Sequence, residues 1–544
     1  MIKINQLKLP VGHSQKDLED KIRKTLRIPS KETFHYEVMR RSLDARKKPS
    51  LFYVYCIYVT IRQENSIVKK LHQPSVSFVT ETGYRFSEMG HERLNRRPVI
   101  VGAGPCGLFA AWQLTLAGYA PLILERGKQV EDRSADVERF WKTGILQPDS
   151  NVQFGEGGAG TFSDGKLNTV VKDPSGRNRY VLETFVKFGA PSDILYDAKP
   201  HIGTDILAKV IKNMRDYLIK HGAEFRFQTC LKDIQIKENA LHALVTEDDT
   251  VIPADVAILA LGHSARDTFM MLHRHQLPME AKNFAVGFRV EHPQQMIDDA
   301  MYGNGKRNAL RLPAAPYKVT SNFPNGRGVY SFCMCPGGVI VPAVSAEGEA
   351  VVNGMSASAR AGRWANSGMV VEIRPEDFPQ YSHFGPLSLM EMQAETERRF
   401  FQASGNTLNA PAQRMKDFTE DRISVDLPAS SYVCGLHSAD LSALLPRFVA
   451  TRLKEGFRKF GQRYKGFLTN EACMIGLESR TSSPVRIPRD KDTLHHPDHE
   501  GLYPAGEGAG YAGGIVSAAL DGRRCAEAAV AMLKENTSDQ DDKQ

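Results

Sequence analysis

VIVGAGPCGLFAAWQLTLAGYAPLILERG, residues 99–127, is the stretch that decides the fold of this chain. It has the pattern of a strand, a glycine turn, a helix and a second strand, with G-x-G-x-x-G at Gly102, Gly104 and Gly107. The glycines would allow a tight turn, a close approach to a pyrophosphate at the helix N-terminus, and close helix–strand packing. Glu125 ends the second strand, where a carboxylate accepts hydrogen bonds from a ribose diol. The stretch therefore predicts a dinucleotide site.

A second motif near the other end of the chain favours FAD over NAD. GLYPAGEGAGYAGGIVSAALDGRRCAEAA, residues 501–529, resembles the second flavin motif of glutathione-reductase-type FAD proteins. The resemblance implies that Glu507 holds the ribitol chain. It also implies that Gly513, Gly514 and Ile515 direct backbone N–H groups at the flavin edge that becomes negative on reduction.

Two middle segments agree with this interpretation. VAILALGHSARD, residues 256–267, resembles the strand that returns the chain beside the cofactor. NVQFGEGGAGTFSDGKL, residues 151–167, contains four glycines within six positions, which indicates backbone close to a flat ligand, although a flexible surface loop is the alternative. The residues expected at the cofactor are Gly102, Gly104, Pro105, Cys106, Gly107, Glu125, Arg126, Gly158, Gly160, Thr161, Ser163, Leu231, Gly262, Gly506, Glu507, Gly513, Gly514 and Ile515.

Seven motifs together resemble a bacterial group of FAD-dependent dehydrogenases, a branch of glutathione-reductase-type flavoproteins. They lie within residues 98–535 and are GAGPCGLFAA, NVQFGEGGAGTFSDGKL, HIGTD, ALGHSARD, CMCPGG, ESRTSSPVRIPRD and GLYPAGEGAGYAGGI. The resemblance implies an FAD domain made of discontinuous segments with an inserted substrate domain. It implies no particular substrate.

The fold class that we predict is α/β, with a discontinuous Rossmann-like FAD domain, an inserted α+β substrate domain and a small basic α+β domain at the N-terminus. The predicted boundaries are 1–95 for the basic domain, 96–275 and 481–535 for the FAD domain, 276–480 for the substrate domain, and 536–544 for a frayed tail. The elements predicted outside the motifs are a helix at 14–26 with Ser14 as its N-cap, a meander of short strands at 225–229, 234–236 and 241–245, helices at about 387–403 and 438–460, and a last helix that ends near 533.

Few residues suggest the chemistry itself, so no catalytic residue is assigned. Cys333 and Cys335 share one face of a predicted strand. They are interpreted either as redox-active thiols near the flavin or as small apolar residues of the core. Arg480 and Arg486 could clamp an anionic small-molecule substrate or pair with nearby carboxylates. His263 could move a proton, although a histidine at a strand end is more often structural. No cluster of His, Cys and carboxylates has metal-ligand spacing.

The leading functional prediction is an oxidoreductase with noncovalent FAD that transfers a hydride to or from an unidentified substrate. NAD(P)H is a possible transient donor; it would bind without a second G-x-G-x-x-G unit, since none follows a predicted strand here. Two alternatives stay open. One is a flavin-dependent RNA-modifying enzyme that grips nucleic acid with residues 1–95. The other is a flavin-bound redox sensor without turnover.

Composition sets outer limits on these functions. Hydrophobic residues at 42% and charged residues at 24% are typical of a globular protein and exclude a largely disordered or fibrous chain. Eight cysteines among 544 residues predict reduced thiols in the cytoplasm rather than a disulfide framework. The N-terminus lacks the apolar core of a signal peptide. Residues 98–124 carry no charge, but glycines and prolines divide them, so we expect no membrane span.

The net charge of +7 is unevenly distributed along the chain. Residues 1–100 contain 20 Lys and Arg against 10 Asp and Glu, whereas the remaining 444 contain 50 against 53. The basic excess therefore belongs to the N-terminal domain and suggests an anionic partner rather than a property of the cofactor site.

Overall fold

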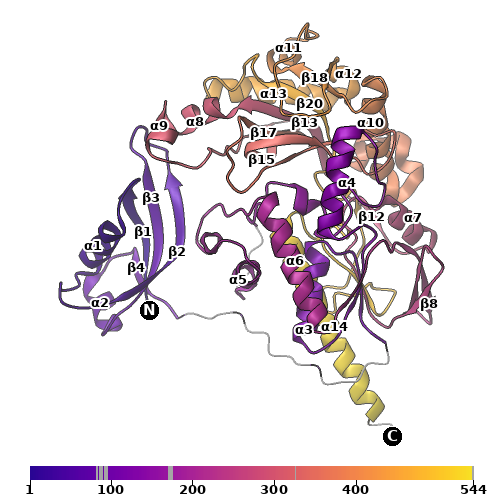
Figure 1. Cartoon of the computed structure of the whole chain (residues 1–544), viewed down its shortest axis with the longest axis horizontal. Coiled ribbons are helices and arrows are strands. Elements are labelled where there is room, and N and C mark those ends of the chain that lie inside the picture. The colour runs from indigo at the N-terminus through magenta and orange to yellow at the C-terminus, as the bar shows by residue number, and fades with distance from the viewer. Residues whose placement is uncertain (81–83, 85–89, 91–95, 170–174, 325, 542–544) are drawn as a thin grey trace.

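Three parts of the molecule are visible in Figure 1: an N-terminal domain at one side, a lower body that contains α3, α6 and α14, and an upper body built on a large sheet. This computed structural model describes all residues except 81–83, 85–89, 91–95, 170–174, 325 and 542–544. The predicted fold class, α/β with a discontinuous Rossmann-like domain, is confirmed.

The N-terminal domain has the order β-α-β-β-α-β and one antiparallel sheet, β2-β3-β1-β4. Its first helix begins after Ser14, whose hydroxyl caps the helix as the sequence predicted. The alternating pattern of β3 buries Tyr55, Ile57 and Val59. The second helix and the last strand were not predicted. The elements are β1 (Ile2–Pro10), α1 (Gln15–Leu26), β2 (His35–Asp44), β3 (Phe52–Thr60), α2 (Glu64–Leu71) and β4 (Val76–Phe78).

The lower body contains a five-stranded parallel sheet in the order β22-β11-β5-β6-β7, so segments from the middle and the end of the chain flank the first motif. Its strands are β5 (Val99–Val101), β6 (Leu122–Leu124), β7 (Glu224–Arg226), β11 (Ala257–Leu259) and β22 (Leu502–Pro504). A separate antiparallel sheet holds β8 (Leu231–Lys237), β9 (Ala240–Thr246) and β10 (Val251–Pro253). The prediction that residues 225–229 begin this meander was wrong, because β7 pairs with β6.

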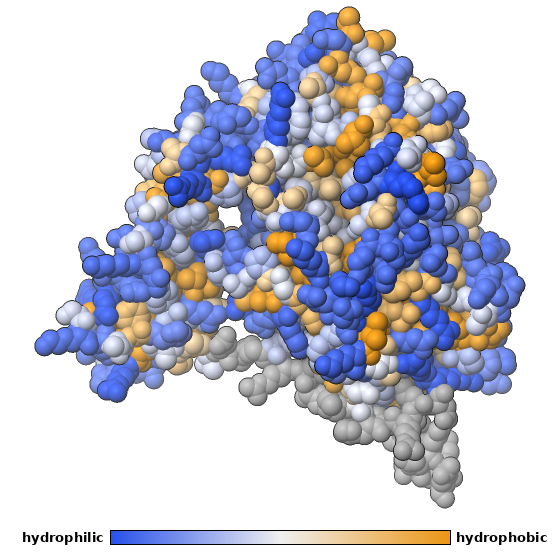
Figure 2. Space-filling view, viewed as in Figure 1, coloured by the Kyte–Doolittle hydropathy of each residue, from blue (hydrophilic) through white to orange (hydrophobic). Residues whose placement is uncertain are grey.

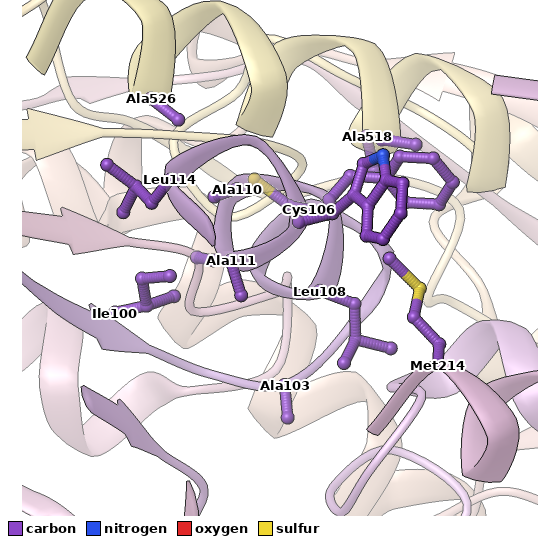
Figure 3. Close-up of a cluster of buried hydrophobic side chains, with 14 of the residues drawn as sticks. Ile100, Ala103, Cys106, Leu108, Ala110, Ala111, Leu114, Met214, Ala518 and Ala526 are labelled. Atoms are coloured by element: carbon purple, nitrogen blue, oxygen red, sulfur yellow. The ribbon is translucent and has the colours of Figure 1, made fainter. Parts of the chain in front are cut away.

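Helix packing in the lower body depends on small residues. Figure 3 shows Cys106 and Ala110 of α3 near Ala518 and Ala526 of α14 in one buried cluster. A Cβ at Gly522 would lie 2.0 Å from the Cys106 carbonyl oxygen, so only glycine allows this approach. The helices of this body are α3 (Pro105–Leu116), α4 (Val130–Thr143), α5 (Arg177–Lys187), α6 (Thr204–Lys220), α7 (Arg266–Arg274) and α14 (Ile515–Asp541), with 3₁₀ turns η1 (Ala159–Phe162) and η2 (Ser192–Leu195).

The upper body is a mixed eight-stranded sheet with the path β14-β15-β17-β13-β20-β18-β19, and β16 pairs with β15. Its strands are β13 (Phe284–Pro293), β14 (Thr320–Phe323), β15 (Gly326–Pro342), β16 (Val352–Met355), β17 (Trp364–Ile373), β18 (Ala410–Arg414), β19 (Leu436–Ser438) and β20 (Cys473–Glu478). Two short strands, β12 (Glu280–Ala281) and β21 (Val485–Arg486), pair at its lower edge.

Helices surround this sheet, and most of them share its apolar core. They are α8 (Gln294–Tyr302), α9 (Lys306–Ala309), α10 (Ser388–Ala403), α11 (Met415–Thr419), α12 (Leu441–Leu444) and α13 (Arg447–Arg463), with η3 (Pro375–Asp377) and η4 (Pro379–Leu387). A helix predicted at 438–460 is shifted, because β19 and α12 precede α13. The last helix, predicted to end near 533, continues to Asp541 and includes part of the expected tail; 542–544 lie outside the described residues.

Backbone hydrogen bonds attach the N-terminal sheet to the lower body. Arg41 exchanges them with Tyr196 and Ala198, and its guanidinium pairs with Asp197 at 2.8 Å. Figure 2 shows hydrophilic residues over much of the visible surface of all three parts, with apolar patches scattered among them. No helix in the described ranges is both long and apolar enough to cross a membrane. All eight cysteines are described and free; a cytoplasmic location stays a prediction.

Candidate active site

A cavity of about 360 Å³ lies where the carboxyl end of the parallel sheet faces the upper body. The predicted residues that line it are Gly102, Gly104, Pro105, Cys106, Glu125, Arg126, Gly158, Gly160, Ser163, Leu231, Gly262, Glu507, Gly513, Gly514, Ile515, Cys333 and Arg480. The structure thus brings both glycine motifs and part of the expected substrate region to one space.

The first glycine turn is shaped by contacts that exclude larger residues. Gly102 has φ +104°, and a Cβ there would lie 2.4 Å from the Ala260 carbonyl oxygen. A Cβ at Gly107 would lie 1.8 Å from the Gly102 carbonyl oxygen. Gly107 does not line the cavity; it lets α3 approach the turn, so the N-terminus of α3 opens toward the cavity.

Glu125 is held by the backbone around it. Its carboxylate accepts hydrogen bonds from the amides of Ala103 at 2.8 Å, Gly127 at 2.9 Å and Gly155 at 3.0 Å. A carboxylate has about four lone-pair positions, so a further donor such as a ribose hydroxyl can still be accepted. Beside it, Arg126 lies over the Phe154 ring at 4.4 Å and pairs with Asp267.

The second motif places Glu507 and the start of α14 against the same cavity. Burial raises the pKa of Glu507 to about 7, although Lys282 opposes this. Nothing in the protein lies within 4 Å of a Cβ built at Gly513, so bare backbone faces open space there. Gly506 does not line the cavity: its amide donates to Asp521 at 2.7 Å.

The glycine-rich loop 151–167 is fixed rather than flexible. Arg133, fully buried in α4, donates hydrogen bonds to the carbonyls of Asn151, Val152, Glu156 and Gly158 at 2.7–3.0 Å. The flexible-loop alternative is therefore wrong. Thr161 points into the packing of this loop, close to Gly157, and does not line the cavity.

The upper body supplies the roof of the cavity, which we define as Phe332, Cys333, Asn353, Arg480 and Thr481. Cys335, two residues after Cys333, is fully buried outside the cavity. The roof residues come from β15, β16 and the segment after β20, and they face the glycine loops below.

Arg480 is saturated by protein groups. It donates two hydrogen bonds of 2.8 Å to Glu397 and one of 3.0 Å to the Ser264 hydroxyl, and Glu349 lies 3.3 Å away. Its charge is thus balanced inside the protein. Of the two interpretations of Arg480 from the sequence, these contacts favour pairing with carboxylates of the protein over a clamp for an anionic substrate. Arg486 is exposed on β21, over the Tyr511 ring, and does not line the cavity.

His263 lines the cavity at the end of a hydrogen-bond chain. The Gln153 side chain donates through its amide nitrogen to the Ala343 carbonyl. This bond directs the amide oxygen of Gln153 toward the Ser264 hydroxyl, which donates to it at 3.3 Å. Because the Ser264 hydroxyl donates its proton to Gln153, it accepts a hydrogen bond from Nδ1 of His263 at 2.8 Å. Nε2 of His263 is then unprotonated and can accept. Burial, helped by Arg480, lowers the pKa of His263 to about 3, so the ring is neutral.

Several cavity residues were not singled out from the sequence. Three of them fall inside the glycine-rich segment 151–167, and Ser264 falls inside the motif ALGHSARD, so these segments were the signal for them. The others lie outside the quoted motifs. Among the residues not singled out are Gln153, Phe154, Lys166, Asn168, Thr229, Ser264, Thr268, Phe332 and Asn353.

The geometry fits a flavin dinucleotide. Two helix N-termini, those of α3 and α14, open on one cavity, which suits a pyrophosphate and an electron-rich ring edge. Bare backbone at Gly262 and Gly513, each without a protein atom within 4 Å of a Cβ, leaves room for a flat group.

Comparison with known proteins agrees with this fit. A family described as FAD-dependent protein, C-terminal domain-like, matches residues 283–481. An NAD(P)-binding Rossmann-like domain matches residues 100–139, and a domain of unknown function matches residues 1–60. An uncharacterized protein of Clostridium beijerinckii is 43% identical over 529 residues, which is 97% of this chain and 98% of that protein. This chain belongs to the same family as the Clostridium protein, and its residues 283–481 match the FAD-dependent domain. FAD is its cofactor.

The solved structures that match this FAD-dependent protein are only distantly similar to it. Halogenase PltM in complex with phloroglucinol and FAD shares 10% identity over 81% of this chain and 71% of its own, with a TM-score of 0.38. L-amino acid deaminase from Proteus vulgaris shares 12% over 82% and 96%, with a TM-score of 0.33. At this similarity they say nothing about the reaction. Membership of the glutathione-reductase-type branch stays a prediction.

Proposed function

We propose that this FAD-dependent protein is an oxidoreductase whose small-molecule substrate binds between the glycine loops and the roof of the cavity. The observation that carries the proposal is the shared cavity: the backbone expected to hold the flavin and side chains of the upper body line the same space. Bound FAD would supply hydride transfer through its isoalloxazine ring.

The protein's own groups would bind and orient the two reactants. The N–H groups at the start of α14 would stabilise negative charge on the ring edge. Asn353 and Thr481 offer polar side chains from the roof, and His263 offers a neutral acceptor. Because Arg480 is already paired with Glu397, these contacts suit an uncharged substrate group better than a carboxylate.

The alternatives receive less support. No described residue of the basic domain lines the cavity, so these contacts give the domain no direct role at the site and add no support for an RNA-modifying enzyme. A flavin redox sensor without turnover needs no polar side chains facing the cofactor, so the polar roof favours an enzyme over a sensor. NAD(P)H remains a proposed electron donor.

The test is anaerobic reduction of the purified holoprotein, followed by flavin absorbance, with NADH, NADPH and fractions of a metabolite extract. We expect at least one to bleach the flavin and air to restore it. A full-length folded protein without flavin absorbance would refute the proposal. So would a flavin that dithionite reduces but no fraction does.

A further inference from the structure

Strand β15 is distorted where it crosses the cavity. Its register with β17 shifts on both sides of Cys335, and Cys333 has φ +42°, a conformation uncommon for any residue but glycine. Such bulges re-aim side chains and are frequent beside active sites. Here the distortion separates two cysteines that a regular strand would place on one face: Cys333 lines the cavity and Cys335 is buried.

Two cations hold this distorted backbone. The buried Arg289 of β13 donates to the Cys333 carbonyl and lies 3.3 Å from the Cys335 sulfur. Lys166, which also lines the cavity, donates to the Met334 carbonyl. Both positive charges are therefore held by the backbone at residues 333 and 334, and both act electrostatically on the Cys333 thiol. Lys166 comes from the glycine-rich segment 151–167, whereas Arg289 belongs to none of the flavin motifs.

Negative groups around the thiol are largely neutralised. Asp164 pairs with Arg360 and Lys166, and Glu478 accepts both of its hydrogen bonds from Arg289 at 2.9 and 3.0 Å. Glu507, from the second flavin motif, is the remaining carboxyl that interacts with Cys333.

The balance of these charges favours ionisation of one thiol. A hydrogen bond from Cys335, with Lys166 and Arg289 nearby, lowers the pKa of Cys333 well below that of an ordinary thiol, against the effect of burial. Burial, with Cys333 as neighbour, raises the pKa of Cys335. Of the pair, Cys333 is thus the thiol whose ionised form is favoured, and it is also the one that lines the cavity, whereas Cys335 is buried.

We propose that Cys333 is the active-site thiol of this protein, presented by the β15 bulge to the flavin cavity and reactive toward soft electrophiles. The placement at the flavin rests on the proposed function, whereas the reactivity of the thiol does not. Lys166 is a positioning residue, because it acts through the backbone and the charge around Cys333 rather than by bonding the substrate.

The first experiment treats full-length holoprotein with iodoacetamide between pH 6 and 9 and follows each cysteine by mass spectrometry. Cys434 is the control, since it is partly accessible and burial raises its pKa. Cys333 is expected to react at least about tenfold faster at pH 7, since each unit of pKa changes the thiolate fraction about tenfold. Equal or slower reaction of Cys333 would overturn the proposal.

The second readout is the flavin spectrum during the same reaction. Replacing an ionised thiol by a thioether removes a charge beside the ring, so the visible bands should shift in step with Cys333 modification and stay constant in Cys333→Ser. An unchanged spectrum after complete modification of Cys333 would overturn the placement. Lys166→Met should move the pH midpoint of alkylation upward, which a merely structural lysine would not do.

These results separate the two proposals. If no flavin is bound, the proposed function fails and the alkylation rate still decides the reactivity of Cys333. If the flavin is bound and reducible but Cys333 reacts no faster than Cys434, the inference fails and the proposed function stands.

Discussion

Gly107 and Gly513 both belong to flavin motifs, yet the structure gives them opposite surroundings. A methyl group on Gly107 would collide with backbone at 1.8 Å, whereas one on Gly513 would meet no protein atom and would enter the cavity. The same substitution should therefore damage the fold at one position and the binding of cofactor at the other.

Gly107→Ala should lower stability by about 2–3 kcal/mol, since the clash is with backbone that cannot rotate away. Gly513→Ala should leave the unfolding midpoint of the flavin-free protein unchanged and weaken FAD binding. Urea unfolding and flavin fluorescence titration measure the two effects. Equal destabilisation by both changes would contradict this assignment.

Glu507 should make stability depend on pH. Its pKa is raised from 4.5 to about 7, so the folded protein favours the protonated carboxyl. The contribution of the protonated Glu507 to the free energy of unfolding is fully present below about pH 4.5 and is lost as pH rises through about 7. Between pH 5 and 8 the free energy of unfolding should fall in the unsubstituted protein. In Glu507→Gln, whose side chain stays neutral, this fall should be smaller by about 2 kcal/mol. Urea titrations at both pH values test this, and identical slopes would refute it.

At the scale of elements, buried ion pairs join the upper body to the lower one. Glu397 of α10 binds both Arg480, which follows β20, and Arg266 of α7. Arg266 also reaches Glu349 at 2.6 Å. Four separate segments thus converge on one buried group of charges beside the cavity.

Removing one partner of this group should be costly. Arg480→Met leaves Glu397 and Glu349 with one cation fewer in a buried site, and we expect a loss of about 3 kcal/mol in unfolding free energy. Arg486→Ala is the matched control; it lies nearby but exposed, so its effect should stay below about 0.5 kcal/mol. Equal effects would mean that the ion pairs do not tie the two bodies together.

Among the elements, the ones with strong local signals were predicted from the sequence. The first βαβ unit, the helix capped by Ser14 and the helix near 387–403 were found because glycine turns, caps and apolar periodicity are local properties. Strand β7 was assigned to the wrong sheet, because pairing with β6 depends on residues about 100 positions earlier.

At the scale of the whole molecule, the basic domain is attached beside the flavin body and contributes no described residue to the cavity. Its described attachment includes β2, where Arg41 bonds residues 196–198, and a contact with the upper body, where Lys48 donates to the Ala300 carbonyl and Leu51 joins the apolar core. The charge and the chemistry of this protein are thus separated in space as well as in sequence.

Arg41→Ala should loosen this attachment without affecting the flavin. Because the ion pair is partly exposed, the loss should be at most about 1 kcal/mol. Amide exchange at Ala198, whose N–H donates to the Arg41 carbonyl, should accelerate, while flavin content stays constant. Arg62→Ala, an exposed change in the same domain, is the control. Loss of flavin in Arg41→Ala would show a coupling that the contacts do not predict.

An anionic partner for residues 1–95 stays a prediction. We expect any binding of single-stranded RNA by the full-length protein to weaken steeply with salt, since it would rest on lysine and arginine contacts with phosphate. Fluorescence anisotropy with a labelled oligonucleotide measures it. Absence of binding at low salt would remove nucleic acid as the partner.

The sequence by itself determined the cofactor class and most residues of the candidate site, because flavin binding uses glycine backbone and helix ends that leave a spaced pattern in the chain. It also located the charge, which needs only counting. The tertiary structure alone decided which candidates share the cavity. Cys333 and Cys335 look equivalent in CMCPGG, and only the bulge of β15 turns one to the cavity and buries the other. ESRTSS leaves open whether Arg480 clamps an anion or pairs with a carboxylate, and only packing brings Glu397 against it. Such contacts join residues far apart in the chain, so no local pattern encodes them.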